Sequence, residues 1–169
     1  IDVMVGSMEL NYGNPSSSHG FGRTAKSAIE TARKSVANHL NCEAQEIIFT
    51  SGGTESDNMI LRCGVKDLGI KTIISSRIEH HAVLHVLTFL ESEGVEILYV
   101  DLDLEGSPDL VHLEKLLTAT STRKLVSLMH VNNEIGNILS LKKVANLCKL
   151  NNAYFHTDAV QGVGHFPID

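Results

Sequence analysis

The sequence lacks tryptophan, has only three prolines in 169 residues, and contains no cysteine pair at the CxxC spacing. Its three cysteines, Cys42, Cys63 and Cys148, are odd in number and widely spaced, which argues against a disulfide framework and fits a reducing compartment. We interpret all three as structural. No apolar run approaches the roughly 20 residues of a membrane-spanning helix, and we find no signal peptide. We therefore expect a cytoplasmic protein without a membrane partner.

A basic surface is also missing from the sequence. The formal net charge is −6, and no long run of Lys and Arg occurs. Nucleic acid is not an expected partner, because phosphate-backbone binding needs clustered basic side chains. The composition, with 43% hydrophobic and 20% charged residues, is that of an ordinary globular protein with enough residues for one compact domain.

Helix-like and strand-like segments alternate along the chain. The apolar periodicity predicts helices over 22–40, 54–68 and 80–93, a helix opened by Ser107-Pro108, and one capped by Ser140. Strands are predicted over 46–50, 71–76, 95–102, 124–131 and 153–158, whereas the first 20 residues read as loop. This alternation is typical of an α/β fold with a mostly parallel sheet.

Polar residues follow four of the predicted strands, at the edge where open α/β sheets bind ligands. These segments are Ser51-Gly52-Gly53-Thr54, Glu79-His80-His81, Asn132-Asn133-Glu134, and Asp158 with Gln161. The fifth strand ends in Asp101 and Asp103, for which the sequence suggests no function.

The glycine turn before Thr54 is a candidate phosphate site. Gly52 and Gly53 allow close approach of the backbone, and a helix start offers free N–H groups and a positive dipole end. The segment is neither a Walker loop nor GxGxxG, and a glycine turn that only caps a helix is the alternative.

Asp158 follows an apolar strand, so its charge needs a partner. A salt bridge to an arginine and a cap on the following turn are structural alternatives. The functional interpretation is a carboxylate facing a cationic ring nitrogen, as enzymes that use pyridoxal 5′-phosphate (PLP) require.

The histidines near residue 80 raise the question of a metal site. His81 and His85 share a helix face with the i, i+4 spacing, but no CxxC or HExxH completes a ligand set, and we predict no metal. Asn133 and Gln161, taken alone, are unremarkable loop amides. A phosphate cup, an imidazole, two amides and a carboxylate together favour a flat, phosphorylated, cationic ring. PLP fits this set better than a nucleotide, because a nucleotide site typically has a ribose-binding acid about 20 residues after its glycine loop.

Five motifs in order carry a family resemblance: GNPSSSHGFGR, FTSGGTESDN, EHHAVL, MHVNNEIGN and HTDAVQGVGHFPID. Over residues 11–169 the chain closely resembles the NifS-like cysteine desulfurases, which are fold-type-I PLP enzymes of aminotransferase class V. The resemblance implies a three-layer α/β domain, with helices on both faces of a mostly parallel sheet.

The resemblance also implies residue roles. Gly53 and Thr54 would hold the cofactor phosphate, Asp158 would pair with the pyridine nitrogen, and His80 would stack on the ring and help to move protons, which makes it the catalytic candidate. The residues implied at the ring hydroxyl are Asn133 and Gln161.

The implied activity converts L-cysteine to L-alanine and leaves sulfur as an enzyme persulfide for iron–sulfur cluster assembly or thiolation. A homodimer and sulfur-acceptor or scaffold proteins are the implied partners. Selenocysteine lyase and cysteine sulfinate desulfinase are sibling activities with the same pocket.

Two of the family's covalent groups have no counterpart in the sequence. The segment with the Schiff-base lysine and the small C-terminal domain are absent, and the three cysteines do not match the persulfide position. We therefore expect residues 1–169 to be an incomplete large PLP-binding domain, inactive by itself. A catalytically inactive fragment that binds PLP noncovalently is the remaining alternative.

Overall fold

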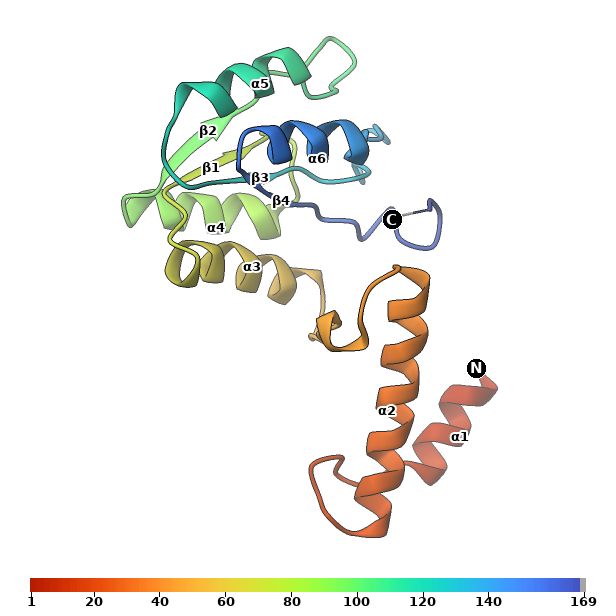
Figure 1. The fold of residues 1–169 in the computed structure, drawn as a ribbon. Helices are drawn as coiled ribbons and strands as arrows, with labels where there is room; N and C mark the ends of the chain where they lie inside the picture. Colours follow the sequence, from red (N-terminus) through yellow and green to blue (C-terminus); the bar gives the residue numbers. More distant parts are fainter. Residues whose placement is uncertain (168–169) are drawn as a thin grey trace. The chain divides into compact units, whose positions relative to one another are not determined.

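The computed structural model describes residues 1–167, which divide into two compact units, 1–49 and 50–167 (Figure 1). Residues 168 and 169, the end of the HFPID motif, lie outside the described residues. The strands and the candidate site all belong to the second unit.

The first unit consists of α1 (Asp2–Leu10), α2 (Gly20–His39) and the short 3-10 helix η1 (Ala44–Glu46). The prediction of loop for the first 20 residues is therefore wrong over α1. The apolar residues of α1 are spread around the helix instead of forming a stripe, so periodicity gave no helical signal there. Helix α2 matches the predicted 22–40 segment, with His19 as N-cap. Of its apolar side chains Ala25 and Ala37 are buried, whereas Ile29 and Val36 are more than a third exposed.

The strand predicted over 46–50 does not form. Glu46 ends η1, and residues 47–50 are extended without sheet pairing. A strand exists only through its ladder of hydrogen bonds. Here the Ile47 carbonyl accepts instead from the Arg33 guanidinium, which also lies 4.8 Å from the centre of the Phe49 ring.

The second unit contains a four-stranded parallel sheet, which confirms the α/β prediction. Its strands are β1 (Thr72–Ser75), β2 (Glu96–Tyr99), β3 (Lys124–Ser127) and β4 (Tyr154–His156), in the order β2-β1-β3-β4. In the central register, Ile73 lies opposite both Ile97 and Leu125. Each strand is shorter than the sequence predicts.

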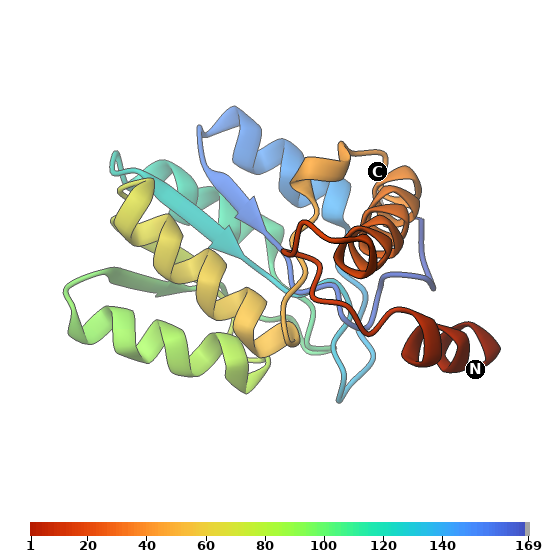
Figure 2. The same cartoon turned by 90° about the horizontal axis from the view of Figure 1, so that it is seen from below.

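Helices cover both faces of the sheet and make three layers, as the resemblance implied (Figures 1 and 2). On one face, α3 (Gly53–Asp67) and α4 (His81–Ser92) enclose a core with Ile73 and Leu125. On the other, α5 (Leu110–Ala119) and α6 (Leu141–Leu150) enclose a core with Ile74 and Val126. Successive strand residues point to opposite faces, so neighbours such as Ile73 and Ile74 serve different cores.

The helix ends follow the expected chemistry with two corrections, at the start of α5 and at Ser140, which precedes α6 without making a side-chain capping bond. Gly69 and Gly94 take positive φ values just after α3 and α4, the backbone conformation that glycine tolerates best. Helix α5 opens at Asp109 and not at Ser107-Pro108: the Asp109 carboxylate accepts from the N–H groups of Val111 and His112, at 2.8 and 3.2 Å. Pro108 forms an isolated bridge with Leu102 instead.

Candidate functional site

A cavity of about 240 Å³ lies at the carboxyl edge of the sheet, where parallel strands deliver their loops. It brings together all six residues that the sequence singled out: Gly53, Thr54, His80, Asn133, Asp158 and Gln161. Four further residues complete its lining: Asp57, Met129, Val131 and Val160. The juxtaposition follows from the topology, because α3, the β1–α4 loop, the loop after β3 and the loop after β4 all open onto this edge.

One end of the cavity is the start of α3. Gly52 is the N-cap, and no side chain of the described residues caps this end; the first intrahelical donor is Ser56 N–H, 3.2 Å from the Gly52 carbonyl. The N–H groups of the first helical turn are thus free for an anion, and the helix dipole favours one. Gly53 faces Val160: a Cβ at Gly53 would lie 3.2 Å from Val160 Cγ2.

Glu55 also belongs to the first turn of α3, but its carboxylate is already engaged. It accepts from the Ser51 N–H at 2.6 Å, and this interaction with Ser51 lowers the pKa of Glu55. The bond fixes the loop before the helix.

His80 is the N-cap of α4. Its Nδ1 accepts from the Ala82 N–H at 3.1 Å, which holds the ring orientation. In the neutral imidazole the proton then resides on Nε2, which is a donor. The ring is exposed and lines the cavity, so a planar ligand has access to it.

Asp158 and Gln161 line the cavity from the segment after β4, which we call its carboxylate end. The Asp158 carboxylate accepts from Val160 N–H at 3.0 Å, and its backbone carbonyl accepts from His130 N–H at 2.8 Å. The predicted cap on this turn is therefore present, and it coexists with a carboxylate that lines the cavity. Gly162 is required here, because a Cβ would lie 2.1 Å from His130 Nδ1.

The two asparagines after β3 have different roles. Asn132 is buried: its Oδ1 accepts from the N–H groups of Glu134 and Ile135, and its Nδ2 donates to the Ile78 carbonyl. Asn133 is exposed and lines the cavity. The buried neighbour shapes the loop that presents Asn133.

The structure shows two buried carboxylates at this edge to which the sequence analysis assigned no role. Glu79 is 6% exposed, accepts from Ser76 Oγ at 2.6 Å and from Met129 N–H at 2.9 Å, and joins the ends of β1 and β3. Burial raises the pKa of Glu79 to about 7, and the negative charges of Asp158 and Asp57 add to that rise.

Asp57, the second of these carboxylates, is 4% exposed on α3. It shares the buried face of the helix with Leu61 and Gly64, at the i, i+4, i+7 spacing. An acidic residue in line with these buried positions could have indicated from the sequence that Asp57 is buried.

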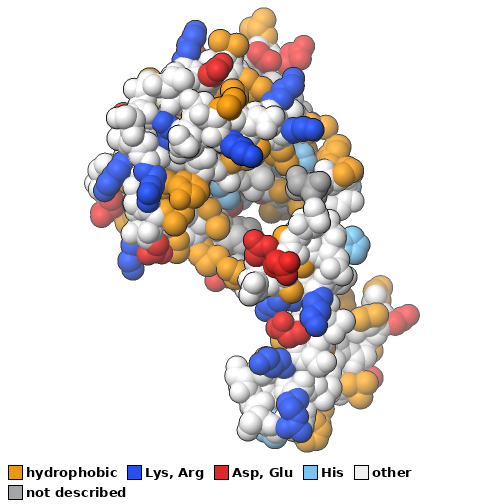
Figure 3. Space-filling model, in the orientation of Figure 1, with side chains coloured by type: hydrophobic (Ala, Val, Ile, Leu, Met, Phe, Trp, Pro, Cys, Tyr) orange, Lys and Arg blue, Asp and Glu red, His pale blue; other side chains and the backbone are white. Residues whose placement is uncertain are grey.

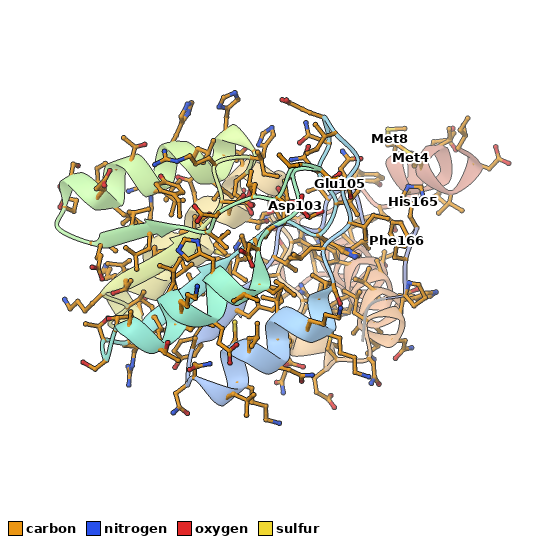
Figure 4. The ribbon with its side chains drawn as sticks, turned by 90° about the horizontal axis from the view of Figure 1, so that it is seen from above. Met4, Met8, Asp103, Glu105, His165 and Phe166 are labelled. Carbon is orange, nitrogen blue, oxygen red and sulfur yellow. The ribbon has the colours of Figure 1, made fainter. Side chains whose placement is uncertain are left out.

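The acidic loop after β2 has a structural explanation that the sequence did not provide. Asp103 and Glu105 lie between β2 and α5 (Figure 4). Asp103 Oδ1 accepts from the N–H groups of Glu105 and Ser107, at 2.9 and 2.8 Å, and the Asp101 carboxylate lies 3.0 Å from His112 Nδ1. These acids stabilise a turn.

The cysteines differ in environment. Cys148 lies on the buried face of α6, and burial raises its thiol pKa to about 12. Cys63, one of the three cysteines that we interpret as structural, is exposed on the face of α3 away from Leu61. Residues 1–167 contain no group of three or more His, Cys, Asp or Glu side chains placed to hold a metal ion.

On the visible face, Lys and Arg side chains are interspersed with acidic and apolar ones among the coloured residues (Figure 3). Of the helices described, none combines the length and apolar character needed to cross a bilayer.

Comparison with known proteins places the chain in a family. The aminotransferase class-V model matches residues 1–169, so the chain belongs to the aminotransferase class-V family. It is 47% identical over 175 residues to a protein of Methanosarcina thermophila named cysteine desulfurase IscS, and 45% identical over 170 residues to one of the same name from Dictyoglomus turgidum. These relatives agree with the resemblance seen in the motifs.

The matches cover 100% and 99% of this chain but 42% and 43% of the two relatives, so the chain spans less than half their length. Among solved structures, a NifS-like protein superposes with a TM-score of 0.93 at 38% identity, covering 99% of this chain and 47% of its own. The structure titled "SspA in complex with cysteine" has a TM-score of 0.92 at 31% identity, covering 99% of this chain and 48% of its own.

Proposed function

We propose that the chain is part of the large PLP-binding domain of a cysteine desulfurase. The observation that carries the proposal is the single cavity lined by all six residues expected to hold PLP. The relatives named cysteine desulfurase support the same activity.

The residues present suit PLP at both ends of the cavity. The uncapped start of α3, with Thr54, offers N–H and hydroxyl groups to a phosphate. At the opposite side, the Asp158 carboxylate suits a protonated ring nitrogen. Asn133 and Gln161 supply amides for the ring hydroxyl.

His80 is the proposed catalytic residue. The Ala82 N–H bond to Nδ1 fixes the ring and leaves Nε2 as the position that holds the mobile proton. The imidazole would cover one face of the ring and transfer that proton to or from the substrate. PLP, when bound, supplies the electron sink for the bond changes in the amino acid.

The proposed reaction consumes L-cysteine and an enzyme thiol and yields L-alanine and an enzyme persulfide. The solved relative whose title places it in complex with cysteine supports L-cysteine as the substrate. The persulfide sulfur would pass to sulfur-acceptor or scaffold proteins, for iron–sulfur cluster assembly or thiolation. We expect the protein to act as a homodimer in the cytoplasm.

Titration of the full chain with PLP tests the proposal. We expect saturable binding with a change in visible absorbance, weakened at least tenfold by Asp158→Asn and unchanged by Asp101→Asn, an acid of the same edge that does not line the cavity. Borohydride reduction followed by intact mass then tells covalent from noncovalent binding. Absence of saturable binding, or equal effects of the two substitutions, would contradict the proposal.

The substrate is tested on the full-length protein. L-cysteine, L-selenocysteine and cysteine sulfinate are compared by alanine production, and we expect L-cysteine to give the highest kcat/KM.

A further inference from the structure

The imidazole of His156, the last residue of β4, contacts polar groups of two other elements. Its Nε2 lies 3.5 Å from Oδ1 of Asp57 on α3, and its Nδ1 lies 3.0 Å from Oγ of Ser127 on β3. The Ser127 carbonyl accepts from Ser75 Oγ of β1 at 2.9 Å. One ring therefore connects α3 to the centre of the sheet.

Both side chains of the Asp57–His156 contact are largely shielded from water, so loss of the contact is costly. The side chains of His156 and Asp57 are 12% and 6% exposed, and a buried carboxylate is costly unless an N–H group faces it. Within residues 1–167, His156 is the basic side chain at ion-pair distance from Asp57. A neutral ring donates from Nε2 while Nδ1 accepts from the Ser127 hydroxyl, and a charged ring donates from both nitrogens. Either state directs an N–H at Asp57.

The two residues lie beside two different segments of the cavity lining. Asp57 follows Thr54 by three residues, about one helical turn, and itself lines the cavity. His156 precedes Asp158 by two residues. The Asp57–His156 contact thus ties the start of α3 to the segment that carries Asp158.

We propose that Asp57 and His156 are positioning residues that set the separation between the anion-binding end and the carboxylate end of the cavity. This inference rests on the proposed function, because PLP is the ligand that would span the two ends. The affinity of a ligand that contacts both ends of the cavity depends on the distance between the ends, whereas the affinity of a ligand that contacts one end does not. Loss of the contact should therefore weaken a spanning ligand and spare a ligand of one end.

Isothermal titration calorimetry of the full chain with three probes tests this. Pyridoxine 5′-phosphate spans both ends and has no aldehyde to react with lysines, pyridoxine occupies the ring end, and inorganic phosphate occupies the α3 end. In Asp57→Asn and in His156→Gln we expect about tenfold weaker binding of pyridoxine 5′-phosphate and less than about twofold change for the single-end probes. The double variant should lose no more than either single variant, because both break the same contact.

Asp67→Asn is the matched control, since it removes the same charge from the far end of the same helix. It should change none of the three affinities. Ser127→Ala keeps the test valid if the other variants fail to fold, because it deletes only the second contact of the imidazole. We expect it to weaken pyridoxine 5′-phosphate about threefold, again sparing inorganic phosphate.

The outcomes separate the two proposals. If the unaltered chain binds inorganic phosphate but not pyridoxine 5′-phosphate, both the proposed function and the positioning role fail. If the unaltered chain binds all three probes and the variants bind them equally well, only the positioning role fails. Equal weakening of all three probes, or a loss for pyridoxine as large as that for pyridoxine 5′-phosphate, also overturns it, because the defect would then be general or confined to the ring end.

Discussion

Glu79 should make the stability of this protein depend on pH across the neutral range. Its carboxyl group is 6% exposed between the ends of β1 and β3, and burial raises its pKa from the ordinary 4.5 to about 7. The bonds from Ser76 and Met129 oppose that rise without cancelling it. Glu79→Gln removes the titration and keeps the shape, and Ser76 Oγ can rotate to accept from the new amide.

The direction of the pH dependence follows from which protonation state of Glu79 the folded protein favours. Because the folded-state pKa lies above the unfolded one, the protonated carboxyl stabilises the fold. This contribution is fully present below about pH 4.5 and is lost as pH rises through about 7. The rise from 4.5 to about 7 corresponds to roughly 3 kcal/mol in the free energy of unfolding.

Urea unfolding at about pH 4.5, 6 and 8 measures this contribution. Far-UV circular dichroism is the suitable probe, since the chain has no tryptophan. We expect the free energy of unfolding of Glu79→Gln, relative to the unaltered chain, to rise by about 3 kcal/mol from the lowest to the highest pH. Glu91→Gln, an exposed acid on α4, should give a pH-independent difference. A pH-independent difference for Glu79→Gln as well would refute the reasoning.

Three smaller predictions concern packing, capping and reactivity. Gly162→Ala should lower the free energy of unfolding by roughly 2–3 kcal/mol, because its Cβ would meet His130, whereas Gly6→Ala in α1 has open space and should cost nothing measurable. Asp109→Ala should cost about 1 kcal/mol through loss of the α5 cap, while Ser140→Ala should cost much less, because Ser140 makes no capping bond; urea melts measure both pairs. Ellman's reagent should label the exposed Cys63 rapidly and the buried Cys148 only on unfolding, and rapid labelling of both would contradict the described core.

In the second unit the sequence predicted the helices and most strands, because their apolar patterns match the faces that are buried in the structure. The stripes of α3 and α4 end at Gly69 and Gly94, and the strand between them, β1, is a short run of mainly β-branched residues. Each of these patterns depends only on residues of a single helix or strand. The topology of a parallel sheet then places the four polar loops at one edge without further information, and the family resemblance selected the six site residues among them.

The sequence predictions failed where contacts with other parts of the chain determine the structure. Residues 46–50 have strand composition, yet composition cannot supply a neighbouring strand to pair with. The strands and α5 begin or end away from the predicted positions because competing local bonds, such as those of Asp109, set the boundaries. Glu79 was visible in the sequence, but its pKa depends on burial between β1 and β3, which only the folded chain reveals.

The distribution of charge around the cavity narrows the choice of ligand. The start of α3 offers N–H groups and a positive dipole, whereas the segment after β4 supplies the Asp158 carboxylate. A simple anion would suit the first end and be repelled by the second, and a nucleotide would bring no cation to the acids. A ligand with a phosphate at one end and a protonated ring at the other satisfies both. Asp57 also lines the cavity, but the His156 ring faces its carboxylate, which leaves Asp158 as the acid available to a cationic ring.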